Sequence, residues 1–182
     1  MSGRAIAAAA PPSVWTIGHS TRPSEELVDV LVAQSIEAVA DVRRWPASRK
    51  HPQFNEDALR RSLADSGVEY LSLPDLGGRR SPRSDSPHDA WRVAAFRGYA
   101  DYMDTEPFRL ALAMLLRLAE RKRTAILCAE ILWWRCHRSL IADLLKSRGH
   151  RVFHIRDRST PEEHPYTSAA RIVGGRLSYA KG

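Results

Sequence analysis

Short β-prone runs alternate with helix-like segments along almost the whole of this chain. The runs occur at 14–17, 38–43, 68–71, 124–127 and 152–155. Each stretch between consecutive runs is long enough for the crossover that a pair of parallel strands requires. This alternation predicts an α/β fold: a single three-layer domain with a mostly parallel sheet of about five strands flanked by helices.

Helix start and stop signals lie where this alternation requires them. Pro23 opens the first helical segment, and Asn55 can cap the second, which Gly67 ends. Thr105 can cap a later helix whose apolar residues recur at helical spacing. The stretch 74–87 is rich in turn-forming residues and predicts a mobile loop.

The length of 182 residues and the hydrophobic content of 43% indicate one domain with a full-sized core. We expect residues 1–13 to form a flexible N-terminal tail, 14–155 the α/β domain, and 156–182 a C-terminal extension packed on the domain or trailing from it. No apolar run approaches the roughly 20 residues of a membrane helix, and two cysteines make no disulfide framework. We therefore expect a cytoplasmic protein with no membrane partner, either a monomer or a homodimer.

The net charge of +7 is compatible with a polyanionic partner such as nucleic acid. The composition of the chain weakens that inference, because only four of the basic residues are lysines and the chain contains many alanines. An arginine-rich, alanine-rich chain is also typical of a GC-rich coding sequence. The charge therefore favours nucleic acid only slightly.

Polar side chains follow three of the predicted strands at the point where each strand ends. His19 follows the first strand, Asp41 and Arg43 end the second, and 128–130 ends the fourth. Ligands of open α/β sheets gather at the carboxyl ends of the strands. We therefore expect one cleft at this edge to contain His19, Asp41, Arg43, Glu130, Cys136 and Arg138.

The segment 128–138 holds both cysteines between a predicted strand and a predicted helix. Cys136 lies at or just before the helix N-terminus and is flanked by cationic side chains, which together favour its thiolate. It is therefore a candidate nucleophile or anion-site residue, with buried packing as the alternative. For Cys128, at the end of the strand, core packing is the stronger interpretation, although the two cysteines can also form a reversible redox pair.

Three further side chains are candidate catalytic groups. Either Asp41 or Glu130 can act as a general base, or can stabilise the oxocarbenium-like centre that forms when a glycosidic bond breaks. Each carboxylate can equally pair with an arginine and only brace the edge of the sheet. His19 is a catalytic candidate, and a structural hydrogen-bonded histidine is the alternative.

Arginine and aromatic side chains supply the candidate substrate contacts, which are Arg43, Arg79, Arg80, Trp133, Trp134, His137 and Arg138. Arginine binds phosphate with two parallel hydrogen bonds, and the backbone at Gly77 and Gly78 can approach an anion closely. Trp133 and Trp134 are adjacent in a predicted loop, so we expect at least one ring to face a cleft or a partner. A stacked nucleic-acid base or a dimer contact would use such a ring equally well.

A metal site is the remaining alternative for this region. Cys128, Cys136, His137 and His19 are zinc-ligand types, but their spacing fits no standard zinc finger or ribbon. No phosphate-binding or dinucleotide-binding motif is present either. We therefore expect no metal and no cofactor.

Taken in order, several short motifs of this chain resemble those of one family. They are Ile17-Gly18-His19-Ser20, Asp41-Val42-Arg43 followed by Pro46 and Ser48, Phe54-Asn55, Leu76-Gly77-Gly78-Arg79, Phe96-Arg97-Gly98-Tyr99, Cys128-Ala129-Glu130 and Cys136-His137-Arg138. From about Val14 to Ile155 the chain resembles the domain of unknown function 488 family. The resemblance implies a small cytoplasmic α/β protein. The family's link to excision of oxidised pyrimidines implies an enzyme that acts on DNA.

The leading hypothesis is therefore a nucleic-acid-acting enzyme, most concretely a DNA glycosylase that excises an oxidised or damaged base without a cofactor. A flipped base would stack on Trp133 or Trp134, and Asp41 or Glu130 would position water. The first alternative is a thiol-dependent enzyme in which Cys136 attacks a small anionic substrate. The second is a non-catalytic module that binds an anion or nucleic acid.

Overall fold

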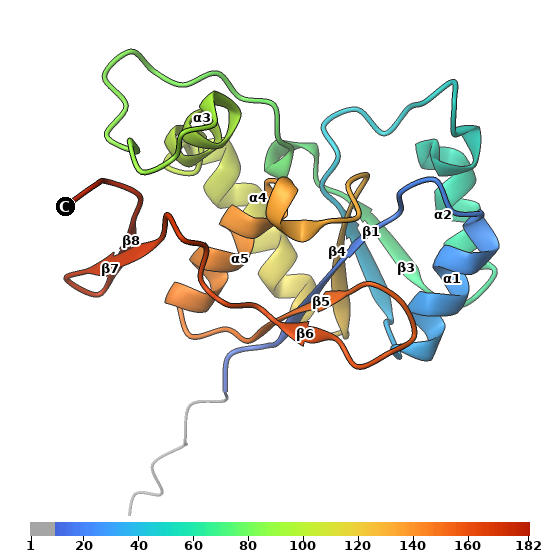
Figure 1. Ribbon diagram of the computed structural model, residues 1–182. Helices are drawn as coiled ribbons and strands as arrows, with labels where there is room; N and C mark the ends of the chain where they lie inside the picture. Colours follow the sequence, from blue (N-terminus) through green and yellow to red (C-terminus); the bar gives the residue numbers. More distant parts are fainter. Residues whose placement is uncertain (1–9) are drawn as a thin grey trace, which may run out of the picture.

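A six-stranded sheet forms the middle layer of the computed structural model, which describes residues 10–182 (Figure 1). Its strands lie in the order β3-β2-β4-β1-β5-β6, and every pair is parallel except β5 with β6. The strands are β1 (Val14–Gly18), β2 (Ala38–Asp41), β3 (Glu69–Ser72), β4 (Thr124–Cys128), β5 (Val152–Ile155) and β6 (Glu162–Glu163). The five predicted strands are all present, and the sequence did not predict β6.

Helices cover both faces of the sheet and complete the three layers (Figure 1). One face carries α1 (Ser24–Ala33) and α2 (Glu56–Ala64). The other carries α3 (Ala94–Tyr102), α4 (Glu106–Ala119) and α5 (Arg138–Ser147). The structure is therefore the single α/β domain that the alternation predicts.

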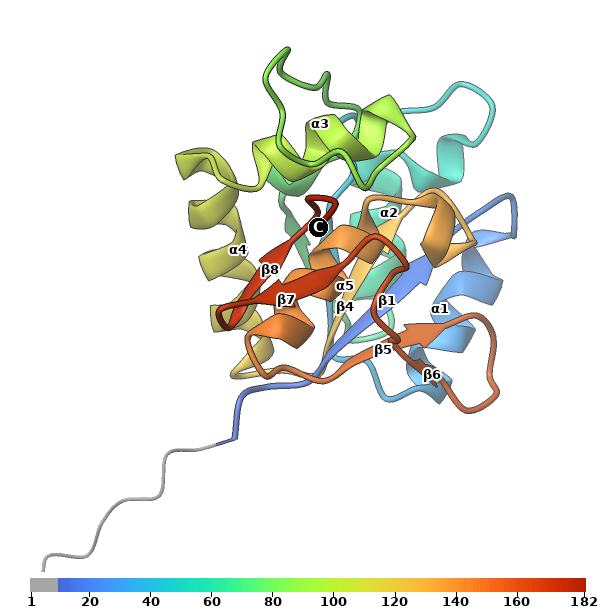
Figure 2. The same ribbon diagram turned by 60° about the vertical axis from the view of Figure 1, so that its left-hand side comes forward.

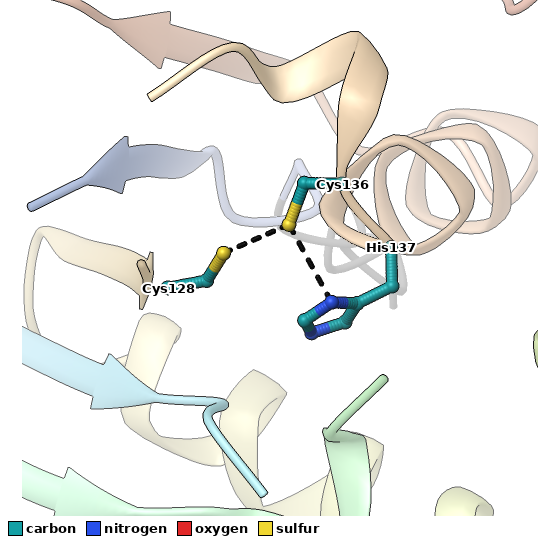
Figure 3. A group of neighbouring side chains, drawn as sticks. All are labelled: Cys128, Cys136 and His137. Carbon is teal, nitrogen blue, oxygen red and sulfur yellow. Dashed lines mark hydrogen bonds between the residues drawn. The ribbon is translucent and has the colours of Figure 1, made fainter. Parts of the chain in front are cut away.

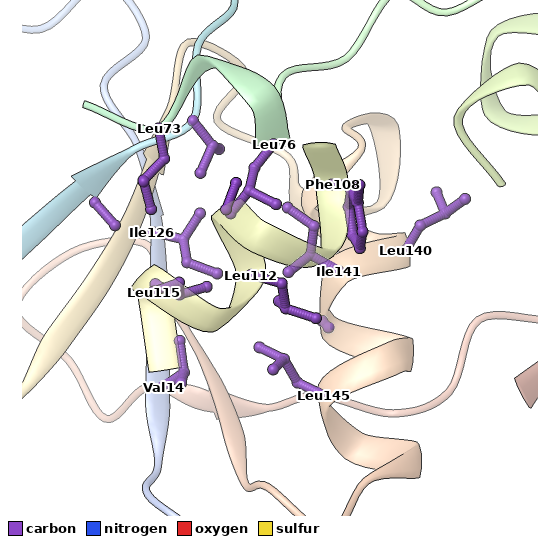
Figure 4. Packing of buried hydrophobic residues seen from close by; sticks show 14 of the residues in the cluster. Val14, Leu73, Leu76, Phe108, Leu112, Leu115, Ile126, Leu140, Ile141 and Leu145 are labelled. Atoms are coloured by element: carbon purple, nitrogen blue, oxygen red, sulfur yellow. The ribbon is translucent and has the colours of Figure 1, made fainter. Parts of the chain in front are cut away.

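The two faces of the sheet have separate cores because successive strand side chains point to opposite sides. On the α4 and α5 face, Val14 and Ile126 pack against Leu112 and Ile141 (Figure 4). On the α1 and α2 face, the next residues in the strands, such as Leu127, pack against the leucines of those helices. Burial on both faces accounts for the short, nearly continuous apolar runs in the sequence.

The side-chain caps predicted at two helix starts do not form. Asn55 precedes α2, but its side-chain oxygen accepts a hydrogen bond from the Ser48 backbone N–H, with an N···O distance of 2.6 Å. Thr105 precedes α4 and donates its hydroxyl to the Tyr102 carbonyl. The Thr105 hydroxyl thus bonds to the last residue of α3, whereas the Asn55 side chain holds the turn after β2.

The C-terminal residues return across α5 instead of ending at the sheet (Figure 2). After β6, a hairpin of β7 (Arg171–Val173) and β8 (Arg176–Ser178) leads to Tyr179, which is buried. The Tyr179 hydroxyl reaches Asp143 on α5, and its carbonyl accepts a hydrogen bond from the Ala90 N–H. These contacts join the last segment of the chain to α5 and to the loop before α3.

Residues 1–9 of the predicted N-terminal tail lie outside the described part of the chain. Between 10 and 182, no helix has both the length and the apolar character that crossing a membrane requires. The predicted loop 74–87 contains a short 3-10 helix, η2 (Pro74–Leu76), and otherwise lacks regular structure.

Candidate active site

The predicted site residues follow strands that are neighbours in the sheet. His19 directly follows β1, Asp41 ends β2, and Cys128 ends β4. Since β4 pairs in parallel with both β1 and β2, the three strand ends adjoin at one edge. This is the edge at which open α/β proteins bind ligands.

A cavity of about 500 Å³ opens at this edge. Of the predicted site residues, Arg43, Arg79, Glu130, Cys136 and His137 line the cavity, whereas His19, Asp41, Arg80, Trp133, Trp134 and Arg138 do not. The structure therefore divides the predicted set into residues that can touch a ligand in the cavity and residues that lie outside its lining.

The two cysteine sulfurs meet in the wall of the cavity (Figure 3). Cys128 Sγ lies 2.8 Å from Cys136 Sγ, and His137 Nδ1 lies 3.4 Å from Cys136 Sγ. Burial opposes a charge on Cys136, but the hydrogen bond from Cys128, His137 and the nearby Arg138 together lower the pKa of Cys136 well below its usual value. The same hydrogen bond and burial raise the pKa of Cys128. Of the two thiols, Cys136 is therefore the one whose surroundings favour the thiolate, and its sulfur shares a hydrogen bond with that of Cys128.

Arg138 brings a positive charge beneath these sulfurs, and only 1% of its surface is exposed. Its guanidinium donates to the Thr16 hydroxyl and to the carbonyls of Glu130 and Ile131. None of these acceptors is a carboxylate. Burial alone would lower the pKa of Arg138, yet the attraction of Cys136 and Cys128 raises it. The buried cation thus lies where it favours a negative charge on Cys136.

The Asp41 carboxylate is fully buried and is occupied by hydrogen bonds from two residues. Arg43 donates to both of its oxygens, with a closest N···O distance of 2.5 Å, and the Tyr70 hydroxyl donates to Oδ2 at 2.7 Å. Arg43 also donates to the Phe54 carbonyl at 2.7 Å. Asp41 therefore fixes the Arg43 guanidinium at the cavity wall and has no oxygen directed at the cavity.

His19 lies behind Arg43 and is held on both ring nitrogens. Nδ1 donates to the Ser20 carbonyl at 2.8 Å, and Nε2 lies 3.4 Å from Arg43 Nη1. The ring stacks on Phe54 with centroids 4.1 Å apart. Burial, with the nearby Arg43 charge, lowers the pKa of His19 to about 4. His19 is therefore a neutral acceptor for Arg43 at neutral pH.

Glu130 is the carboxylate that lines the cavity. Its Oε1 accepts a hydrogen bond from the Leu132 N–H at 3.0 Å. Its backbone N–H lies 3.3 Å from Cys128 Sγ, and its carbonyl accepts from Arg138. Glu130 thus presents a charged group to the cavity while its backbone supports the thiol pair.

Trp133 and Trp134 lie in η3 (Trp133–Arg135), outside the cavity. Trp133 is buried and stacks on His154, with centroids 4.2 Å apart and an interplanar angle of 6°. Trp134 is 44% exposed and contacts the Trp133 ring edge-on. A ligand in the cavity therefore contacts neither ring, and the expectation that one ring faces a cleft or a partner stays a prediction for the exposed Trp134.

The aromatic rings that do line the cavity are Trp45 and Phe96. Arg44 and Arg135 line it as well, and the Arg44 guanidinium lies 4.6 Å from the Trp45 ring centroid. Sequence reasoning missed Trp45, which is 59% exposed. A tryptophan just after the polar end of a strand was the available signal, because a turn at that position projects over the edge of the sheet.

Gly78 and Gly18 allow two backbone segments to approach the site closely. A Cβ on Gly78 would lie 2.8 Å from His137 Nδ1, and a Cβ on Gly18 would lie 2.0 Å from the Glu130 carbonyl oxygen. Gly78 therefore packs against an imidazole where the sequence suggested close approach to an anion. Gly18 lets the end of β1 lie against the turn that follows β4.

Three potential metal ligands gather at the thiol pair. Cys128 Sγ, Cys136 Sγ and His137 Nδ1 lie within 4.8 Å of one another, and His19 is not part of the group. Thiolate and imidazole ligands suit zinc or monovalent copper. The buried Arg138 beside both sulfurs opposes a further cation, so the electrostatics favour a protein-held thiolate over a metal centre.

Comparison with known proteins is informative at the level of the family. No curated protein and no solved structure matches the chain. One family model matches residues 23–145, which is more than half of the sequence. These residues run from the start of the first helical segment to α5 and include Asp41, Arg43 and the thiol pair. On this match, the chain belongs to the family described as Domain of unknown function DUF488.

Proposed function

We propose that this protein is a thiol-dependent enzyme in which Cys136 attacks a small anionic substrate. The observation that carries the proposal is the Cys136 sulfur in the cavity wall, 2.8 Å from Cys128 Sγ and close to the buried Arg138. The thiolate is the nucleophilic form of cysteine, and nearby cations and hydrogen-bond donors stabilise it. A buried cysteine that only packs has no need of such partners.

The lining of the cavity supports an anionic substrate. Arg43, Arg44, Arg79 and Arg135 all line it, and arginine matches the geometry of phosphate and carboxylate oxygens. Arg43 is held in place by Asp41, so its orientation does not need to be acquired on binding. A volume of about 500 Å³ accommodates a small molecule. The Trp45 and Phe96 rings provide apolar surface for the rest of it.

In this mechanism the thiolate of Cys136 forms a covalent bond to an electrophilic atom of the bound substrate, and the substrate's leaving group departs with the bonding electron pair. Cys128 keeps its proton and donates a hydrogen bond to the attacking sulfur until attack occurs. His137 Nδ1, 3.4 Å away, is placed to exchange a proton with that sulfur. Both sulfurs must be reduced, which supports a cytoplasmic location.

Alkylation with iodoacetamide tests this proposal directly. Cys136 should react much faster than Cys128 at about pH 7, as read by mass spectrometry of the two peptides. Cys128→Ala supplies the matched control, because it removes the donor that lies 2.8 Å from Cys136 Sγ and should slow the reaction of Cys136. Equal and slow labelling of both cysteines in the folded protein would show that Cys136 is a structural residue.

A DNA glycosylase that excises an oxidised or damaged base is the second candidate, and Glu130 is the observation that favours it. Glu130 lines the same cavity as Trp45 and Phe96, so a carboxylate faces a space bounded by aromatic rings. Glu130 would stabilise the sugar cation or position water, and a flipped base would stack on the rings. Asp41 is not available for that role because Arg43 and Tyr70 occupy its oxygens.

Labelled oligonucleotides that carry uracil, oxidised pyrimidines or oxidised purines separate the candidates. Base release that Glu130→Gln abolishes and Cys136→Ser retains would favour the hydrolase. Steeply salt-dependent binding without turnover would favour a non-catalytic nucleic-acid module.

A further inference from the structure

A chain of hydrogen bonds between buried side chains leads from Arg138 to the far side of α5. Arg138 Nη1 lies 3.3 Å from Thr16 Oγ1, which lies 2.7 Å from His154 Nδ1. His154 Nε2 lies 2.9 Å from His164 Nδ1, and His164 Nε2 lies 3.0 Å from Asp143 Oδ1. All five residues are buried. The chain joins a buried cation to a buried anion, and its members beyond Arg138 belong to neither proposed mechanism.

We propose that His154 and His164 are positioning residues that hold Arg138 beneath the thiols, so the C-terminal segment sets the reactivity of Cys136. This inference rests on the thiol-dependent function proposed above. His164 belongs to the C-terminal segment, and Arg138 lies close to both Cys136 and Cys128. The segment therefore contributes to the site without touching the cavity.

The chemistry of the two ends, together with neutral imidazole rings, fixes the direction of every bond in this chain. A guanidinium can only donate, so Thr16 Oγ1 accepts from Arg138. With both rings neutral, the Thr16 hydroxyl gives its own proton to His154 Nδ1. A carboxylate can only accept, so His164 donates from Nε2 to Asp143. His154 then donates from Nε2 to His164 Nδ1. Each ring then carries its proton on Nε2, and Asp143 Oδ1 accepts from the Thr167 backbone N–H as well as from His164.

The surroundings of the chain keep it in this arrangement. Trp133 stacks on the His154 ring, and burial together with His164 and Arg138 lowers the pKa of His154 to about 2, so that ring stays neutral. Asp143 Oδ2 accepts hydrogen bonds from Thr167 and Tyr179, both of which follow His164 in the sequence. All four ring nitrogens of the two histidines have partners, and breaking one of these links leaves an expensive unpaired buried group.

Arg138 depends on this chain because it lacks a carboxylate partner. Loss of the Thr16 acceptor would free one guanidinium nitrogen and let the charge move away from the sulfurs. The other titratable groups facing Cys136 are Cys128 from β4, His137 at the start of α5 and the buried Tyr99 from α3. None of these is in the chain, so a change made at Thr16 or His164 reaches Cys136 through Arg138.

The test is the pH dependence of the alkylation rate of Cys136 in full-length variants. Thr16→Val removes the hydroxyl at nearly constant shape, and His164→Asn keeps a polar group near the Nδ1 position but is too short to reach Asp143. We expect both profiles to move to higher pH, with the rate at about pH 6 falling roughly three- to tenfold. Thr16→Ser keeps the hydroxyl and should therefore show the same alkylation profile as wild type.

Tyr179→Phe is the matched control for general destabilisation. It removes a hydrogen bond to Asp143 from the same C-terminal segment but lies outside the chain, so its alkylation profile should match wild type even if its melting temperature falls. The inference would be overturned, and the proposed function would stand, if Cys136 of the wild-type protein reacted fast and the pH profiles of alkylation in Thr16→Val and His164→Asn were the same as in wild type. A slow wild-type Cys136 would overturn both.

Nitrogen chemical shifts of the two rings in the wild-type protein test the inference without a variant. Both histidines should be neutral with the proton on Nε2 at about pH 7. A proton on Nδ1 of either ring would contradict the direction of the chain and overturn the proposal, even if the variants fail to fold.

Discussion

At the scale of single residues, the roles in this site are decided by which polar atoms already have partners. Asp41 and Glu130 both follow strands, yet Asp41 is occupied by Arg43 and Tyr70 whereas Glu130 faces the cavity. Sequence reasoning left both carboxylates open as bases or braces. The partner that fills Oδ2 of Asp41 is Tyr70, which is 29 residues away and visible only in the folded structure.

Asp41→Asn should destabilise the protein strongly. The amide cannot replace a carboxylate opposite the mostly buried Arg43, so a buried charge is left uncompensated, at a cost of about 3–5 kcal/mol in the free energy of unfolding. Urea denaturation measures this loss. Tyr70→Phe removes a single hydrogen bond from the same carboxylate and should cost only about 1 kcal/mol. Similar losses in the two variants would contradict the assignment of Asp41 as the holder of Arg43.

Stability should fall in acid because of His19. Its pKa is lowered by burial from 6.5 to about 4, so the unfolded chain binds this proton first as the pH falls. The stabilisation is complete above about pH 6.5, and up to about 3 kcal/mol is lost as the pH falls to about 4. Urea titrations across this range measure the slope. His19→Gln should flatten it, and an unchanged slope would assign the acid sensitivity to other groups.

Oxidation should join the two cysteines. Their sulfurs are 2.8 Å apart and neither is in a disulfide, so a thiol oxidant such as diamide should form the Cys128–Cys136 bond within one chain while diamide is reduced. The linked peptide is identified by mass spectrometry, and a dithiol should restore alkylation of Cys136. Recovery of only mixed or intermolecular disulfides would show that the two sulfurs do not meet in solution.

At the scale of elements, α5 and the turn before it position the thiol pair and Arg138, at the strand-to-helix transition where the sequence predicted the site. The turn brings Cys136 back to Cys128 at the end of β4, and α5 then carries Arg138 under both sulfurs. Apolar runs and helical spacing predicted these elements because they are buried on regular faces. The short, polar strands β6, β7 and β8 have no such period, and only their pairing partners define them.

Gly18→Ala should damage the site from the end of β1. The new Cβ would lie 2.0 Å from the Glu130 carbonyl, a backbone atom that cannot move without shifting the turn after β4. We expect a loss of roughly 1–3 kcal/mol in unfolding free energy and slower alkylation of Cys136. Gly67→Ala is the control: it strains a backbone with φ of +73° but meets no neighbouring atom, so it should cost stability without changing alkylation. Equal alkylation rates in the two variants would exclude a role for this close approach.

At the scale of the whole molecule, the last segment of the chain is part of the folded unit. His164, Thr167 and Tyr179 surround the fully buried Asp143 on α5, and the Lys146 ammonium donates to the His164 carbonyl. The polar composition of this segment resembles that of a trailing tail. Its side chains nonetheless complete a network that begins on β1 and ends on α5.

A chain that ends at 159 should therefore not fold as the full chain does. Asp143 would lose every side-chain donor described for it, and the surface of α5 beneath Tyr179 would be exposed. Thermal unfolding followed by circular dichroism should show a much lower or non-cooperative transition. A truncated chain that melts like the full one would place the boundary of the domain at β5.

Local patterns along the chain were sufficient to predict the parallel α/β domain, the strand ends that bear the site, and the thiol at the start of α5. These follow from side-chain periodicity and from the rule that parallel strands share one carboxyl edge. The tertiary structure alone decided that Trp45 lines the cavity, that Asp41 is occupied, and that Arg138 connects to Asp143 through two histidines. Each of these depends on a partner distant in sequence, and hydrogen-bond pairing between distant segments leaves no periodic trace in the sequence.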